Sequence, residues 1–215
     1  MHKAGFYETY IKRPQDFILA LAGLILCSPL FLGVAALVRV RLGSPVVFSQ
    51  DRPGKINPKT GNESIFRLYK FRTMTEETDS SGKLLADEKR LTPFGRKLRA
   101  SSLDELPELF NVLRGDMSLI GPRPLLVQYL ERYDANQRRR HEVRPGLTGL
   151  SQVHGRNALS WEERLAMDVN YVDHVTFTGD WGILFQTIRT VCRREGIHST
   201  TSATMEEFMG SRKKL

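Results

Sequence analysis

The sequence predicts an α+β fold: one mainly helical domain with a small β-hairpin, preceded by an N-terminal re-entrant membrane helix and carrying interfacial amphipathic helices. Three patterns support this prediction. A stretch of 22 uncharged residues lies near the N-terminus, two short alternating segments flank a loop rich in turn residues, and apolar residues later recur at helical spacing. The chain therefore divides into a membrane-associated segment (residues 1–43), a domain (residues 44–198) and a basic tail (residues 199–215).

The uncharged stretch runs from Phe17 to Val38 and contains a break. As a straight helix it would be about 33 Å long, close to the roughly 30 Å of a bilayer core, which favours a single spanning anchor. Pro29 lies near its midpoint and lacks the N–H needed for the helical hydrogen bond, so a kink is expected there. The hydroxyl of Ser28 can bond a carbonyl of the preceding turn, which makes a bend tolerable in lipid.

Positive charge flanks the uncharged stretch on both sides. Positive residues mark the cytoplasmic side of a membrane helix, so both ends are predicted to be cytoplasmic. A helix that enters the membrane, bends at Ser28–Pro29 and returns to the same face satisfies this rule. The flanking cations are Lys3, Lys12 and Arg13 before the stretch and Arg39 and Arg41 after it.

The rest of the chain has a mixed composition typical of a folded domain. Residues 44–50 and 64–74 read as strands around a turn-rich loop, and residues 77–90 as a polar connection. The last helical pattern has an apolar face with a basic edge, which fits either a lipid-headgroup interface or an ordinary core-facing helix. Helices are predicted over residues 92–99, 105–113, 125–142, 160–175 and 180–196.

Composition limits the partners. Lys and Arg exceed Asp and Glu by 32 − 24 = 8, so anionic partners are expected: nucleic acid, acidic lipid headgroups or phosphorylated small molecules. The two cysteines form no disulfide pattern, which favours a reducing compartment, and the five histidines lack metal-site spacing. The sequence contains no GxGxxG or P-loop motif.

Two neighbouring acids, Asp104 and Glu105, stand before an apolar run. Ser102 and Glu105 have the spacing of a capping box, but Pro107 fits better as the third residue of a helix capped by Asp104. We therefore expect a helix to begin at Asp104 and its partial positive charge to stabilise the ionised carboxylate. Such a residue is either a candidate nucleophile or magnesium ligand, or simply a helix cap.

Arg123 lies between two prolines in the segment GPRP. The prolines restrict the backbone on either side, so the guanidinium is held rigidly and can bind phosphate with two hydrogen bonds. A stiff turn with a solvated arginine is the alternative. Lys70 and Arg99 are further possible phosphate partners.

Three segments together resemble a known family. The segments YKFRTM, SLDELPELFNVLRGDMSLIGPRPLL and RPGLTGLSQVHGRN are similar to the signature blocks of the bacterial sugar transferases, the monotopic phosphoglycosyl transferases. The resemblance extends from about Pro14 to Asp173 and includes the Ser28–Pro29 break. Within the family the chain resembles the short form, a membrane helix plus one catalytic domain, and most closely the enzyme that transfers diacetylbacillosamine 1-phosphate to undecaprenyl phosphate.

The resemblance implies a reaction and a set of site residues. Asp104 would attack the β-phosphorus of a UDP-sugar, expel UMP and hold the phosphosugar until undecaprenyl phosphate accepts it. Mg²⁺ would bind Asp104, and Glu105 would orient the metal, accept a proton or only cap. The protein would lie on the cytoplasmic face of the bacterial inner membrane, contacting lipid and no nucleic acid. Lys70, Arg99 and Arg123 would surround the phosphates, with Arg144, Arg156 and Asp168 in or beside the pocket.

Two other functions are compatible with parts of the sequence. A UDP-sugar glycosyltransferase would release UDP, but the D-x-D element common in metal-dependent enzymes of that kind is missing. A membrane-tethered basic module that binds anionic lipid or nucleic acid would explain the charge, but not the acidic pair beside a clamped arginine. The sugar and the oligomeric state are left open by the sequence.

Overall fold

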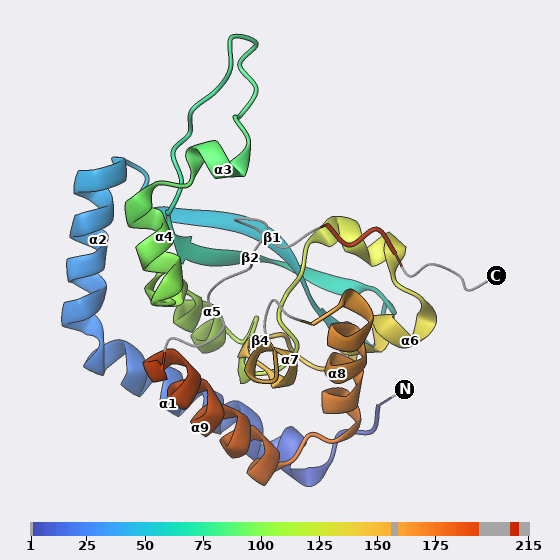
Figure 1. Cartoon of the computed structure of the whole chain (residues 1–215). Helices are drawn as coiled ribbons and strands as arrows, with labels where there is room; N and C mark the ends of the chain where they lie inside the picture. The colour runs from blue at the N-terminus through green and yellow to red at the C-terminus, as the bar shows by residue number, and fades with distance from the viewer. Residues whose placement is uncertain (1, 156–158, 194–206, 211–215) are drawn as a thin grey trace.

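The computed structural model describes residues 2–155, 159–193 and 207–210, and it confirms the α+β class. Figure 1 shows the helices arranged around a long hairpin, with α1 and α2 forming two sides of the molecule. The elements are η1 (Tyr7–Ile11), α1 (Lys12–Leu26), α2 (Ser28–Leu42), β1 (Val47–Ile56), β2 (Glu63–Phe71), α3 (Asp87–Arg90), α4 (Pro93–Ala100), η2 (Leu103–Glu105), α5 (Glu108–Arg114), β3 (Ser118–Ile120), η3 (Val127–Arg132), α6 (Ala135–Arg138), η4 (Arg139–Glu142), β4 (Gly146–Thr148), α7 (Leu150–Val153), α8 (Trp161–Asp173) and α9 (Phe177–Arg193).

The predicted hairpin is present. Strands β1 and β2 pair antiparallel with Val47 opposite Phe71, and the register shifts between Pro53 and Ile56. One face of β2 carries Phe66 and Leu68 into the core, as the alternating pattern predicts. A second sheet, the parallel pair β3–β4, was not predicted, because strands of three residues give too short a pattern to recognise.

The helix predicted over residues 125–142 is wrong. The segment forms three short elements, η3, α6 and η4, because Tyr133 is extended and Asp134 starts a new helix. The Asp134 side chain accepts a hydrogen bond from the Gln137 N–H at 2.8 Å, which makes a capping box there. A strong local cap therefore overrides the helical periodicity.

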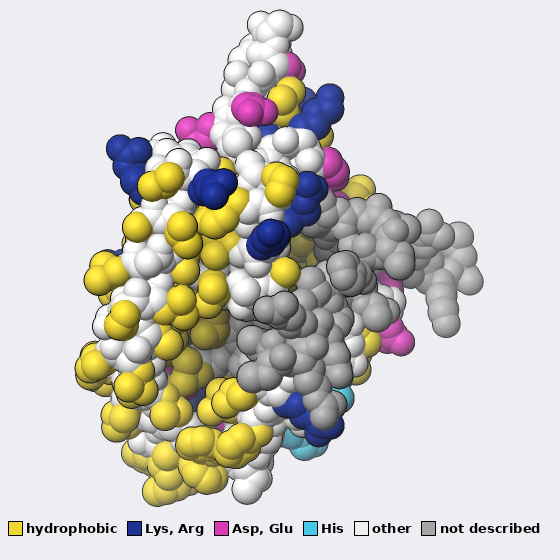
Figure 2. All heavy atoms as spheres, turned by 60° about the vertical axis from the view of Figure 1, so that its left-hand side comes forward, with side chains coloured by type: hydrophobic (Ala, Val, Ile, Leu, Met, Phe, Trp, Pro, Cys, Tyr) yellow, Lys and Arg dark blue, Asp and Glu magenta, His cyan; other side chains and the backbone are white. Residues whose placement is uncertain are grey.

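The N-terminal helices bend where the sequence predicts a break. Helix α1 ends at Leu26 and α2 begins at Ser28, and Ser28 Oγ donates to the Ile25 carbonyl at 2.8 Å. Within the described residues no single helix has the length and apolar composition to cross a membrane, whereas residues 7–26 and 28–42 qualify only as a pair bent by 65°. Figure 2 shows apolar side chains gathered over these helices; the exposed ones are Phe17, Ile18, Leu21, Ile25, Leu26, Leu30, Leu32, Leu37 and Val40.

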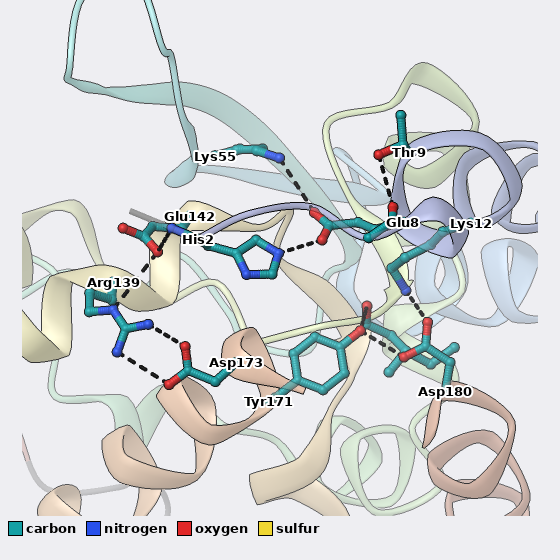
Figure 3. Close-up of polar contacts among 12 residues, drawn as sticks. His2, Glu8, Thr9, Lys12, Lys55, Arg139, Glu142, Tyr171, Asp173 and Asp180 are labelled. Carbon is teal, nitrogen blue, oxygen red and sulfur yellow. Dashed lines mark hydrogen bonds and ion pairs between the residues drawn. The ribbon is translucent and has the colours of Figure 1, made fainter. Parts of the chain in front are cut away.

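Helix α1 is fixed to the domain by buried polar contacts. Lys12 forms an ion pair with Asp180 of α9, and Tyr171 donates a 2.8 Å hydrogen bond to the same carboxylate (Figure 3). Further along α1, Asp16 accepts a 2.7 Å hydrogen bond from Ser118 Oγ. Lys12, counted above as a charge flanking the membrane helix, is thus an internal anchor.

The residues before α1 also contact the domain. The His2 ring lies 2.5 Å from Glu8, and the His2 backbone N–H donates to Glu142 of η4 at 2.8 Å (Figure 3). Lys55 of β1 lies 3.6 Å from Glu8. These contacts fix the direction in which the chain enters α1.

The main core lies between α1, β2, α5, β3 and α8, where Ala20, Leu68, Val112 and Val172 are fully or almost fully buried. Helix α9 adds Ile183 to this core but exposes Phe185 and Ile188, so the apolar residues that the sequence places on one face are divided between the core and the surface. Near the C-terminus, Phe208 is only 1% exposed. The predicted boundary between domain and tail falls outside the described residues.

Candidate active site

The two acids do not begin a helix, contrary to the sequence-based expectation. Asp104 and Glu105 lie in the 3₁₀ turn η2, and α5 begins only at Glu108, after Pro107 in the N-cap position. Because Pro107 has no N–H, the Leu103 carbonyl instead accepts from the Leu106 N–H, at 3.4 Å. The acidic pair therefore lies before the helix, and Asp104 is not the N-cap residue of α5.

Glu105 holds two of the predicted cations. Its Oε1 atom lies 2.7 Å from Lys70 Nζ of β2 and also accepts a hydrogen bond from Arg123 Nη2, beyond β3. Lys70 and Arg123 together keep the pKa of Glu105 well below its usual range despite burial. Strand β2, turn η2 and the GPRP segment thus meet at one carboxylate.

Asp104 is the carboxylate of this cluster that no described side chain contacts through a hydrogen bond or an ion pair. It is 6% exposed, and among the described residues it makes no hydrogen bond or ion pair through its side chain. Burial, and then the charge of Glu105, raise its pKa to about 6. The expected stabilisation of its ionised form by a helix N-terminus is therefore wrong; at neutral pH it is a largely ionised, poorly solvated carboxylate.

Glu108 is a third acid that sequence reasoning missed. It is 2% exposed and lies 3.0 Å from Lys70 Nζ, so Lys70 bridges Glu105 and Glu108. Burial raises the pKa of Glu108 to about 7. Its position four residues after Asp104 was the available signal, because that spacing places two side chains on one face of a helical segment.

Among the described residues, neither Arg99 nor Asp168 forms an ion pair with a member of the cation–carboxylate cluster. Arg99 Nε donates to Thr73 Oγ1 at 3.0 Å, and its charge opposes the rise in the pKa of Asp104. Asp168 pairs with Arg140 at 2.7 Å, and Arg140 donates to the Arg123 carbonyl at 2.7 Å. Asp168 therefore supports the GPRP backbone and does not touch the carboxylates.

One predicted residue, Arg144, is not brought to this cluster. Arg144 Nε donates to the Gly115 carbonyl at 3.0 Å, beyond the C-terminal end of α5, whereas Glu105 and Glu108 lie at its start. Arg156 falls outside the described residues. The roles of both remain predictions.

Mg²⁺ is the metal ion that the family resemblance implies for this cluster. Within the described ranges no group of three or more His, Cys, Asp or Glu side chains is arranged to hold a metal ion. Mg²⁺ in phosphoryl-transfer sites commonly uses one or two carboxylates together with substrate phosphates and water. The unengaged carboxylate of Asp104 fits that kind of site, in which the substrate supplies most of the ligands.

Comparisons with known proteins show the family to which the sequence is similar. A sequence model of the bacterial sugar transferase family matches residues 7–194, a range that includes all the acids and cations described above. An uncharacterised sugar transferase, EpsL of Bacillus subtilis (strain 168), is 52% identical over 201 residues, covering 94% of this chain and 96% of the relative.

Two relatives have more specific names. The UDP-N-acetylgalactosamine–undecaprenyl-phosphate N-acetylgalactosaminephosphotransferase of Aeromonas hydrophila is 40% identical over 190 residues, covering 85% of this chain and 44% of the relative. The undecaprenyl-phosphate galactose phosphotransferase of Salmonella typhimurium (strain LT2) is 37% identical over 206 residues, covering 88% of this chain and 42% of the relative.

Proposed function

The chain belongs to the bacterial sugar transferase family, and we propose that it transfers a sugar 1-phosphate from a UDP-sugar to undecaprenyl phosphate with release of UMP. The observation that carries this proposal is Asp104, an unengaged carboxylate beside Lys70 and Arg123. The names of the relatives from Aeromonas and Salmonella support the lipid acceptor.

In the proposed first step, an oxygen of ionised Asp104 attacks the β-phosphorus of the donor. A carboxyl–phosphate bond forms, the bond to the bridging oxygen breaks, and UMP leaves with that oxygen. In the second step an oxygen of undecaprenyl phosphate attacks the same phosphorus and restores the free carboxylate. The poor solvation of Asp104 favours this role, because fewer water contacts must be broken before it attacks.

The surrounding charges have separate roles in this proposal. Lys70 and Arg123 bind phosphate oxygens, and Glu105 positions both cations. Because Glu105 accepts hydrogen bonds from both cations, and they keep its pKa well below its usual range, this proposal gives Glu105 a positioning role rather than that of general base. Mg²⁺, if bound at Asp104, would offset the negative charge of the diphosphate and of departing UMP.

The membrane element would place this site near its lipid substrate. We propose that α1 and α2 enter and leave the cytoplasmic face of the bacterial inner membrane as a re-entrant helix. Their 65° bend and exposed apolar side chains support this arrangement.

The sugar is proposed to be N-acetylated, either diacetylbacillosamine or a related sugar. The Aeromonas relative, named for N-acetylgalactosamine, supports an N-acetylated sugar, whereas the Salmonella relative, named for galactose, keeps a non-acetylated donor among the candidates. A panel of these UDP-sugars, scored for UMP, would identify the substrate.

The test uses the purified full chain with UDP-sugar and undecaprenyl phosphate. UMP is the expected product; release of UDP would indicate a sugar transferase that leaves the phosphate behind, and no release would indicate a binding module. Without acceptor, the intact mass should increase by one sugar phosphate. Asp104→Asn should lose both signals, whereas Asp51→Asn, at an exposed acid on β1, should retain them. Turnover by Asp104→Asn within about tenfold of the parent would exclude the covalent mechanism.

A further inference from the structure

Arg52 of β1 lies at the same site but has no assigned role. Its Nη2 donates to Gln50 Oε1 at 2.6 Å, and its Nη1 makes a long, 3.4 Å contact with the Pro124 carbonyl. Its Nε atom is buried and has no hydrogen-bond partner in the part of the chain that is described. Within the same residues no carboxylate forms an ion pair with it. Arg52 is therefore a largely desolvated cation with incomplete hydrogen bonding.

Its surroundings make this arrangement unfavourable in the absence of an anion. Burial, and then the positive charge of Arg123, lower the pKa of the Arg52 guanidinium to about 10. Glu108 has the opposite effect on Arg52, but its carboxylate contacts Lys70 and its own pKa is raised to about 7. Glu108 therefore compensates Arg52 only partly near neutral pH.

Arg140 shows how this protein satisfies a buried arginine that serves only the fold. Its Nε and Nη2 atoms both donate to Asp168, at 3.0 Å and 2.7 Å, and Nη2 also donates to the Arg123 carbonyl. Arg52 contacts the next carbonyl of the GPRP segment, that of Pro124, and has no such carboxylate among the described residues. A buried cation without a carboxylate partner, beside residues proposed to bind a substrate, is typical of a group whose counter-ion is the ligand.

We propose that Arg52 is a phosphate-binding residue that completes an arginine pair with Arg123 and contacts a phosphate oxygen that Arg123 and Lys70 leave free. This inference rests on the proposed function, since it assumes a phosphorylated substrate at the acidic cluster. The phosphate belongs either to the nucleoside diphosphate of the donor or to the monophosphate of the lipid acceptor. The neighbouring carboxylates offset the positive charges of Lys70 and Arg123, and Arg52 adds a further positive charge that can bind an anionic substrate.

The competing explanation is mechanical: through Pro124, Arg52 would only brace the GPRP backbone. The test measures the binding of UDP and of uridine to the full-length protein in detergent by calorimetry. Arg52→Gln should weaken UDP binding about tenfold or more, because a charge-assisted hydrogen bond is lost, and should leave uridine binding unchanged. Arg52→Lys, which keeps the charge, should recover part of the loss.

Arg67→Gln is the matched control, because the Arg67 side chain is 66% exposed on the paired strand and pairs only distantly with Asp51. It should bind UDP as the parent does. Equal weakening of UDP and uridine by Arg52→Gln would establish the brace and overturn the inference, as would unchanged UDP binding together with an unchanged KM for undecaprenyl phosphate.

The source of the phosphate follows from the same variant. Unchanged UDP binding with a raised KM for undecaprenyl phosphate would assign Arg52 to the acceptor, whereas weakened UDP binding assigns it to the donor. If the parent itself bound no UDP, the proposed function would fail and this inference with it. If the parent bound UDP, and Arg52→Gln had the same affinity for UDP and the same KM for undecaprenyl phosphate as the parent, the inference alone would fail.

Discussion

At the scale of single residues, three neighbouring acids have three different electrostatic environments. Glu105 pairs with two cations and its pKa is strongly lowered, whereas the pKa values of Asp104 and Glu108 rise to about 6 and about 7. Their shared burial raises all three pKa values, and only Glu105 receives enough compensation to reverse the effect. Near neutral pH the site can therefore hold a paired carboxylate, an ionised one without a charge partner and a partly protonated one.

Glu108 gives a prediction for stability against pH. Its folded-state pKa of about 7 exceeds its ordinary value of 4.5, so the folded protein binds more protons than the unfolded chain between these values. Stability should therefore fall as pH rises from about 4.5 to about 7. Glu108→Gln removes this loss and should raise the melting temperature at pH 8 on the order of 5 °C, with little change at pH 5.

The measurement is thermal unfolding of the detergent-solubilised protein at both pH values. Glu131→Gln, at an exposed acid of η3, serves as the control and should show no such difference. A lower melting temperature for Glu108→Gln at pH 8 would mean that ionised Glu108 stabilises the fold through Lys70, contrary to the prediction.

The sequence was sufficient to identify Asp104, Glu105, Lys70 and Arg123 as one group, and the structure brings the last three into contact around Glu105. The sequence could not identify the charge state of each acid. That charge state depends on burial, which is set by distant elements packing over the turn, and on the pairing of the cations with Glu105 rather than with Asp104. Glu108 escaped notice because a lone glutamate in a helix is usually solvent-exposed.

At the scale of elements, the periodic patterns located most helices and the hairpin but not their interruptions. Residues 125–142 look continuously helical, yet the cap at Asp134 divides them. The bend at Ser28 was predictable because proline acts locally. The parallel pair β3–β4 was not, because its pairing depends on residues 28 positions apart in sequence (Ser118 and Gly146).

Phe208 provides the second prediction, at the level of element packing. Its ring centroid lies 5.7 Å from that of Tyr129, 5.5 Å from that of Tyr133 and 5.2 Å from that of Trp161, and Arg132 donates to its carbonyl. The residue thus joins the C-terminal segment to η3 and α8. Phe208→Ala should lower the free energy of unfolding by about 3–5 kcal/mol, because it leaves a cavity among aromatic rings.

Denaturant titration monitored by tryptophan fluorescence measures this effect, since Trp161 is part of the cluster. Met209→Ala is the control, because Met209 is 76% exposed in the same segment. Equal stability of Phe208→Ala and the parent would show that the C-terminal segment does not contribute to the folded domain.

At the scale of the whole molecule, the apolar helices α1 and α2 are fixed to the domain that carries the acidic cluster. Lys12 and Asp16 fix α1 to the domain through Asp180 and Ser118, while Val38 of α2 packs in a second cluster with Phe71. The bend at Ser28 is therefore held from both sides as well as by the proline. A straight helix would have to break these buried contacts on at least one side.

This arrangement makes a specific prediction for membrane topology. Both termini should face the cytoplasm, and an impermeant thiol reagent applied to intact cells should label neither residue 2 nor residue 215 when each is changed to cysteine. Cys27 and Cys192 are first replaced so that they give no signal. Labelling of position 2 from outside in the otherwise unaltered protein would mean that the segment spans the membrane.

Replacing Ser28 by alanine and Pro29 by leucine removes the local cause of the bend and leaves 22 apolar residues, long enough to span. Because Lys12 and Asp16 still hold α1 against the domain, only a minority of chains should then expose position 2 outside. Adding Asp180→Asn removes the charge partner of Lys12 and should increase that fraction. If the double change alone moved every N-terminus outside, Ser28 and Pro29 would be the only determinants of the bend; if the triple change moved none, the remaining contacts of α1 and α2 with the domain would suffice to hold it.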